Sequence, residues 1–228
     1  MALREAWISF REDDDAWVAV ITGAGDRAFS AGQDMKEIGE RRSQAAGRSF
    51  WETWFGGDLQ EGLEVWKPIV AAVNGYCLGE GLTLILACDF RIASEQATFG
   101  FPEVSLGLPT IVGAVRAPRV MGLGNALEIL LTGERIDSRR ALEMGLVNRL
   151  VPHDQLMEEA ESLARRLCRN GPLAVRCTKE AAVRSLDMPF VEAVRMGEAL
   201  RRLALQSEDV VEGMRAYLEK REPRFTGR

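Results

Sequence analysis

The sequence predicts an α/β protein with a mainly helical C-terminal region. Short apolar segments that fit buried strands alternate with helical segments along residues 17–93. From residue 126 onward the pattern is helical almost throughout, interrupted by an extended segment at 145–151. Repeated strand–helix order followed by a run of helices is typical of an α/β core with an added helical layer.

The elements follow from the spacing of apolar residues. Residues 2–11 fit a helix, residues 17–22 a short strand and residues 69–73 a strand buried on both faces, because it lacks alternation. A buried helix over 81–88 leads into a strand at 89–93. The C-terminal part predicts helices at 155–169, 173–185, 189–204 and 208–221.

Composition and charge exclude several classes of protein. The formal net charge of −5 disfavours nucleic acid or an anionic membrane as a partner. No apolar run reaches the ~18 residues of a membrane span, and the N-terminus is too polar for a signal peptide. The four cysteines lack metal-ligand spacing, so we expect a cytoplasmic protein with no metal site.

Residues 23–28, Gly-Ala-Gly-Asp-Arg-Ala, match the dinucleotide-binding fingerprint. No amphipathic helix starts there, residues 29–32 fit a loop, and no second strand ends in an acid at the expected distance. A plain turn is the favoured interpretation. His153, the one histidine, lies beside Pro152 with no evident triad partner, which argues against Ser-His chemistry.

Three glycine-rich segments surround one acid in an apolar setting. Glu103 stands in the run Phe-Gly-Phe-Pro-Glu-Val-Ser-Leu-Gly, residues 99–107. Upstream, residues 28–38 contain Ala-Gly-Gln-Asp, and residues 68–76 precede Gly-Glu-Gly at the start of a helix. Together these segments resemble the crotonase (enoyl-CoA hydratase/isomerase) superfamily, from about residue 17 to the C-terminus.

The resemblance implies a crotonase-like ββα spiral core, over residues 1–170, and a C-terminal helical trimerisation layer, over 171–228. We therefore expect a homotrimer or a hexamer. Relatives usually open with a strand and turn that carry part of the CoA-adenine site. The helix-like start at residues 2–11 offers no counterpart to that hairpin.

The resemblance also implies the chemistry. An acyl-CoA thioester becomes an enolate, and two backbone N–H groups stabilise its oxygen. These oxyanion-hole donors map to Gln33 and Glu80, and the base maps to Glu103. Coenzyme A enters as part of the substrate, with no bound cofactor, in a role such as fatty acid metabolism. Lys36 and Lys220 match family positions that contact the CoA phosphates, and Tyr217 matches a position beside the adenine. Ordinary solvated lysines explain the first two equally well, and helix packing explains Tyr217 equally well.

Thr83 stands where the family's hydratases have their first acid. A hydroxyl is a poor general base, whereas a 1,3-proton shift needs only one base, so the residue inventory favours isomerase over hydratase chemistry. A hydratase (lyase) despite Thr83, or a crotonase-fold protein that only binds its ligand, are the alternatives. The Glu80 side chain is either a surface acid or a second catalytic carboxylate.

Overall fold

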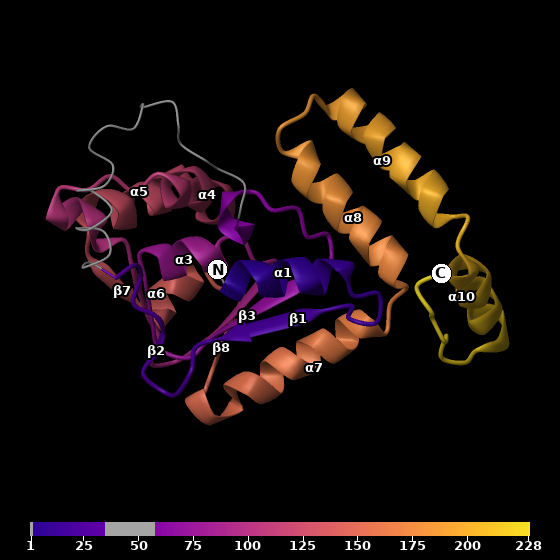
Figure 1. Cartoon of the computed structure of the whole chain (residues 1–228), viewed down its shortest axis with the longest axis horizontal. Helices are drawn as coiled ribbons and strands as arrows, with labels where there is room; N and C mark the ends of the chain where they lie inside the picture. Colours follow the sequence, from indigo (N-terminus) through magenta and orange to yellow (C-terminus); the bar gives the residue numbers. More distant parts are fainter. Residues whose placement is uncertain (1, 35–57) are drawn as a thin grey trace. The chain divides into compact units, whose positions relative to one another are not determined.

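The computed structural model describes residues 2–34 and 58–228. The chain forms two compact units, one helical and one α/β (Figure 1). The helical unit consists of Met1–Ala19, Glu64–Ile69 and Glu161–Arg228, and the α/β unit of Val20–Leu63 and Val70–Ala160. The expected boundary at residue 170, and the assignment of 171–228 to oligomerisation, stay predictions.

Within the described residues, the strands form two four-stranded sheets. One sheet has the order β1 (Ala19–Thr22), β3 (Ile69–Val73), β5 (Phe90–Ser94) and β8 (Arg149–Val151). The other has the order β2 (Ala28–Ser30), β4 (Tyr76–Leu78), β6 (Thr98–Gly100) and β7 (Arg135–Asp137). Strands β1 to β6 enter the two sheets in turn, whereas β7 stays in the sheet of β6 and β8 returns to the first sheet. The pairs β2–β4, β3–β5, β4–β6 and β5–β8 are parallel, and the β6–β7 pair is antiparallel.

The centre of the first sheet is the part that the sequence predicts best. All five residues of β3 are buried, as their unbroken apolar run indicates. Val70 pairs with Phe90 and Val73 with Ala93, so β3 and β5 run in parallel along four residues. The expected loop at residues 29–32 is wrong in part, because Phe29 and Ser30 belong to β2 and pair with β4.

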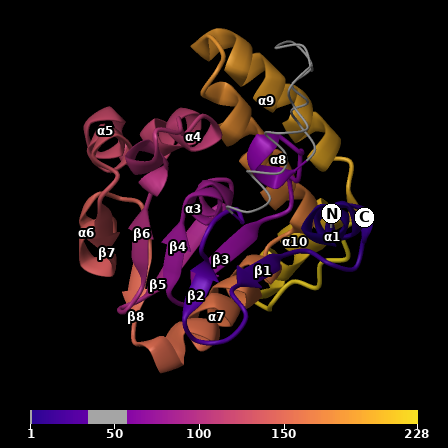
Figure 2. The same ribbon diagram turned by 60° about the vertical axis from the view of Figure 1, so that its left-hand side comes forward.

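Helix α3 (Glu80–Ile85) directly follows β4 and contacts β2, β4 and α4 (Val112–Met121) (Figure 2). A Cβ on Gly81 would lie 2.5 Å from the Cβ of Ser30, so only glycine lets the helix approach β2 this closely. The other described elements of this unit include α5 (Leu123–Thr132), α6 (Ser138–Glu143) and the 3₁₀ turns η1 (Leu59–Glu61), η2 (Pro102–Leu106) and η3 (His153–Gln155). The start of α3 is thereby held at a fixed place beside the second sheet.

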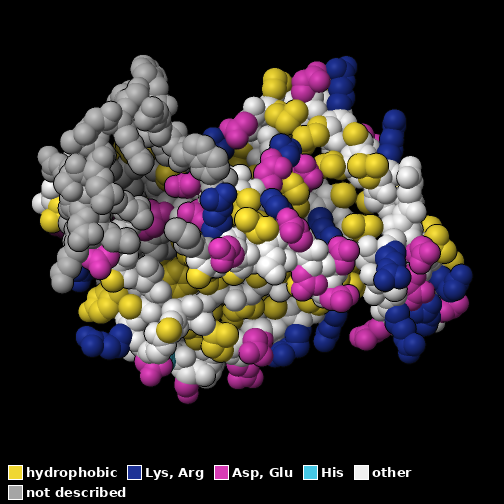
Figure 3. Space-filling view, in the orientation of Figure 1, with side chains coloured by type: hydrophobic (Ala, Val, Ile, Leu, Met, Phe, Trp, Pro, Cys, Tyr) yellow, Lys and Arg dark blue, Asp and Glu magenta, His cyan; other side chains and the backbone are white. Residues whose placement is uncertain are grey.

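The helical unit contains α1 (Ala2–Glu12), most of α7 (Leu156–Cys168), α8 (Pro172–Ser185), α9 (Phe190–Ala204) and α10 (Glu208–Glu219), as predicted to within two residues. Helices α8 and α9 pack against each other, and Lys179 on α8 donates to the carbonyls of Val65 and Lys67 at 2.8 and 2.9 Å. Hydrophobic side chains gather over α8 and α9 (Figure 3). Those exposed there include Val183, Leu186, Phe190, Val191, Val194 and Leu203.

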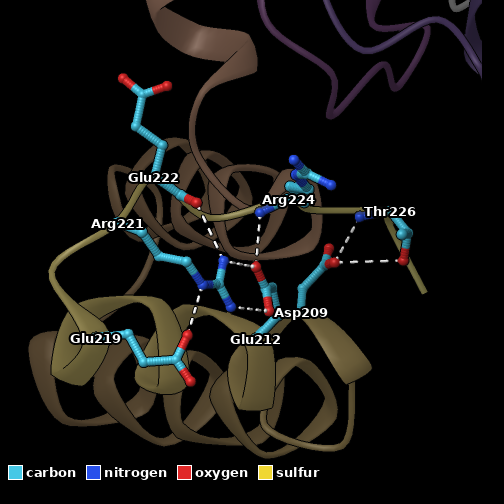
Figure 4. A network of polar contacts seen from close by, with 7 residues as sticks. All are labelled: Asp209, Glu212, Glu219, Arg221, Glu222, Arg224 and Thr226. Atoms are coloured by element: carbon cyan, nitrogen blue, oxygen red, sulfur yellow. Dashed lines mark hydrogen bonds and ion pairs between the residues drawn. The ribbon is translucent and has the colours of Figure 1, made fainter.

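A network of ion pairs fastens the C-terminal segment to α10 (Figure 4). Arg221 donates to both carboxylate oxygens of Glu212, at 2.6 and 2.9 Å, and to Glu219 at 2.6 Å. Asp209 accepts the backbone N–H groups of Thr226 and Gly227. Within the described residues, no helix is long and apolar enough to cross a membrane.

Candidate active site

A cavity of about 380 Å³ opens in the α/β unit beside the start of α3. Its wall is built from the loop after β2, the first turn of α3, η2 and the loop that leads into α4. Four of the residues singled out from the sequence line it: Gln33, Glu80, Thr83 and Glu103. The segments that carry these residues are far apart in sequence, and the fold brings them together at one cavity.

Two glycines allow the loops around the cavity to lie close together. Gly32 has φ +93°, and a Cβ there would lie 3.7 Å from the backbone nitrogen of Glu80. Gly79 has φ +54° with ψ −120°, a conformation that side chains with a Cβ rarely adopt. The residues that follow these glycines are Gln33 and Glu80, so the two predicted backbone donors belong to neighbouring loops.

The backbone N–H of Glu80 has no acceptor inside its own helix. Glu80 is the first residue of α3, and the first N–H groups of a helix lack intrahelical partners. Such a group is available to an oxygen that enters the cavity. The hydroxyl of Ser30, at the end of β2, accepts the N–H of Gly32 at 3.3 Å and fixes the adjoining loop.

Glu103 presents its carboxylate to the same loops from η2. A Cβ on Gly79 would lie 3.2 Å from Oε1 of Glu103, so the carboxylate rests against the glycine. Its Oε2 atom is buried and has no hydrogen-bond partner in the part of the chain that the structure describes. Phe99 and Phe101 of the same segment are fully buried but are not in the described lining of the cavity.

Thr83 lies one turn further along α3 and is buried. Its Oγ1 donates to the carbonyl of Gly79 at 3.3 Å, a bond that a helical threonine commonly makes to the preceding turn. The hydroxyl proton is therefore directed at the backbone. This arrangement favours a packing role for Thr83 over activation of water.

The Glu80 side chain is half-buried in the cavity wall. The sequence alone was compatible with either a surface acid or a catalytic acid at this position. Its Oε1 accepts from Nε2 of Gln60 at 2.8 Å. Burial raises the pKa of Glu80; the Gln60 hydrogen bond works against this, whereas Glu61, Glu103 and Asp58 add to it. Gln60 was missed from sequence, because nothing in its neighbourhood marks it as close to residue 80.

Of the predicted CoA contacts, Tyr217 and Lys220 are not in the described lining of this cavity. Lys36 lies outside the described residues. Tyr217 and Lys220 belong to the helical unit, where Tyr217 is exposed and Lys220 ends α10 in the left-handed conformation with φ 55°. Their proposed role stays a prediction.

His153 has partners that the sequence did not reveal. Its Nδ1 lies 3.1 Å from Oγ of Ser94, and its Nε2 lies 3.8 Å from Asp26. The expectation that it has no triad partner is therefore wrong. Ser94 has no exposed surface, however, so a substrate has no access to its hydroxyl. The contact between Ser94 and His153 links β5 to η3.

Comparisons with known proteins agree with this geometry. A family profile described as enoyl-CoA hydratase/isomerase matches residues 2–228. The carnitinyl-CoA dehydratase of Salmonella typhimurium is 40% identical in an alignment of 232 positions that covers 100% of this chain and 88% of that protein. Among solved structures, an enoyl-CoA hydratase/isomerase from Mycobacterium paratuberculosis has a TM-score of 0.89 at 41% identity, covering 100% of this chain and 88% of its own. An enoyl-CoA hydratase from Bacillus anthracis has a TM-score of 0.89 at 34% identity, with the same coverage.

Proposed function

Since the chain belongs to the enoyl-CoA hydratase/isomerase family, we propose that it moves a proton at the α-carbon of an acyl-CoA thioester, with Glu103 as the base. The observation that carries this proposal is the position of Glu103. Its carboxylate rests against Gly79, between the loops whose backbone N–H groups are the predicted oxyanion donors, with one oxygen free of partners among the described residues. A base and an oxyanion hole on one cavity are what enolate formation requires.

In this mechanism the thioester oxygen accepts hydrogen bonds from the N–H groups of Gln33 and Glu80. Negative charge grows on that oxygen as Glu103 removes the α-proton, and fixed donors in a partly enclosed cavity stabilise the charge without reorganising. Coenzyme A is part of the substrate. Contacts from Lys36, Lys220 and Tyr217 to its phosphates and adenine are part of the proposal.

Two reactions use this enolate. Double-bond isomerisation follows from the residue inventory, because Thr83 replaces an acid and one base suffices for a 1,3-proton shift. Hydration and its reverse, dehydration, form the second candidate. It is supported by the carboxylate of Glu80 in the cavity wall and by relatives that carry the name carnitinyl-CoA dehydratase.

Assembly and setting are also proposals. The exposed apolar side chains of α8 and α9 support a homotrimer or a hexamer, because surfaces of this kind commonly mark subunit contacts. A cytoplasmic location and a role in fatty acid metabolism agree with a CoA-linked substrate.

The test is deuterium incorporation at the α-carbon of a panel of saturated, 2-enoyl, 3-enoyl and 3-hydroxyacyl-CoA thioesters in D₂O, followed by mass spectrometry. The wild-type chain should exchange the α-proton of at least one thioester. Glu103→Gln should slow that exchange by about 100-fold or more, the usual contribution of a general base. Binding of thioesters without any exchange would instead favour the non-catalytic alternative.

A further inference from the structure

The cavity contains a second carboxylate beside Glu103. The family resemblance assigns only the backbone N–H of Glu80, yet its side chain also lines the cavity, together with Glu103 and Thr83. Residues 80 and 83 are three apart on α3 and so share one face of the helix. A carboxylate at 80 therefore projects from the same face as the acid that position 83 lacks.

The side chain of Glu80 is held in place by two layers of contacts. Gln60, on η1, donates its amide to Glu80 at 2.8 Å. Arg116, on α4, in turn donates to the carbonyl oxygens of Gln60 at 2.7 Å and Leu59 at 3.3 Å, which fixes η1. A solvated surface acid has no need of such support, whereas a reacting group must be held to within a fraction of an ångström.

The charges around the cavity favour the neutral form of the Glu80 carboxyl. Glu61, Glu80 and Glu103 all line it, and its described lining includes no lysine, arginine or histidine. Neighbouring carboxylates in a partly buried site resist ionising together. The pKa of Glu80 is raised, chiefly by burial and further by the charges of Glu61, Glu103 and Asp58.

We propose that Glu80 and Glu103 act as an acid–base pair that adds water to a 2-enoyl thioester and removes it from a 3-hydroxyacyl thioester, with Glu80 in the role that Thr83 leaves unfilled. This inference rests on the proposed function. It deepens that function by assigning a second catalytic residue and a substrate class.

The protons needed for hydration all come from Glu80, Glu103 and one water molecule. In the hydration direction the reacting form has Glu103 protonated and Glu80 ionised, so Glu80, whose pKa is raised by burial, must first lose its proton. Glu80 takes a proton from water as its oxygen bonds to C3, the C2–C3 double bond opens to the enolate, and Glu103 gives its proton to C2. The pair still holds one proton, now on Glu80, and exchange with solvent resets it. Dehydration runs through the same steps in reverse.

The experiment compares Glu80→Gln with the wild type in two assays on the same substrates. Hydration of a short 2-enoyl-CoA is followed by the loss of ultraviolet absorbance, and α-proton exchange of a saturated acyl-CoA by mass. We expect Glu80→Gln to lower kcat for hydration by about 100-fold or more and to lower exchange by a much smaller factor, because glutamine keeps the backbone donor and cannot take the proton from water. Glu134→Gln, which alters an exposed acid outside the cavity, should change neither rate.

Three results would overturn the pair. Glu80→Gln could hydrate as fast as the wild type, it could lose exchange and hydration equally, or the wild type could isomerise a 3-enoyl-CoA without hydrating any 2-enoyl-CoA. Circular dichroism of each variant shows that the fold is intact. Absence of α-proton exchange in the wild type is a separate result, which would remove the proposed function itself.

Discussion

The cavity of the α/β unit and the C-terminal network of the helical unit use carboxylates in opposite ways. In the cavity, Glu103 has a buried oxygen without a partner among the described residues, and burial raises the pKa of Glu80. In the network, hydrogen bonds from Arg221 and from the backbone of Arg224 lower the pKa of Glu212 to about 2. A carboxylate with charged donors is fixed as an anion, whereas one in a poorly solvated cavity can exchange a proton.

The largest expected effect is a loss of turnover in Glu103→Gln without a loss of stability. Glu103→Gln removes the base and keeps the side-chain volume, so turnover should fall by about 100-fold or more. The midpoint of thermal unfolding should stay the same or rise, because a neutral amide is easier to bury than a carboxylate without partners. Steady-state kinetics and calorimetry on the same preparation measure both. A variant that is inactive because it unfolds earlier would show that Glu103 is structural.

The second prediction concerns the glycine on which that carboxylate rests. Gly79→Ala places a Cβ 3.2 Å from Oε1 of Glu103 and imposes a positive φ on a residue that resists it. We expect a loss of about 1–3 kcal/mol in the free energy of unfolding. Turnover should fall by more than in Gly124→Ala, where an added Cβ meets no atom within 4 Å. Equal behaviour of the two variants in denaturant titration and kinetics would contradict the close packing at Gly79.

A smaller effect should come from the residue that supports Glu80. The Gln60 hydrogen bond lowers the pKa of Glu80, so Gln60→Leu should raise it further and move the acidic limb of the kcat/KM profile for hydration to higher pH. The charged groups that act on Glu80 are Glu61, Glu103 and Asp58, and all of them act in the same direction. The profile of Glu134→Gln is the control. If the acidic limb of the Gln60→Leu pH profile does not move, ionisation of Glu80 does not determine that limb.

The smallest expected effect is a loss of stability in the ion-pair network around Arg221 and Glu212, and it should appear only at acidic pH. The pKa of Glu212 is lowered from 4.5 to about 2 in the folded chain, so its ion pair stabilises the fold fully above pH 4.5 and the effect is lost as the pH falls toward 2. Hydrogen exchange of the Arg224 amide, which donates to Glu212 at 2.8 Å, should lose its protection over that range. In Glu212→Gln the protection should already be weaker at pH 7, with kcat unchanged.

Much of the fold was predictable because it depends on local patterns. The unbroken apolar run of β3 and the helical spacing of α7 to α10 specify these elements without reference to distant residues. The three-residue strands β2, β4, β6 and β7 were not predicted, because so short a segment shows no period. Phe29 and Ser30 become a strand only through pairing with residues near 76, far along the chain.

The sequence alone identified the family and predicted the two glycine-flanked donors and the base, since these occupy short motifs whose glycines and acid have a fixed order. The tertiary structure decided what surrounds them. It placed Gln60 and Arg116 behind Glu80, directed the hydroxyl of Thr83 at the carbonyl of Gly79, and paired His153 with the inaccessible Ser94. Each of these contacts except the one within α3 joins segments distant in sequence. Side-chain partners of this kind depend on how the elements pack, which a local pattern does not encode.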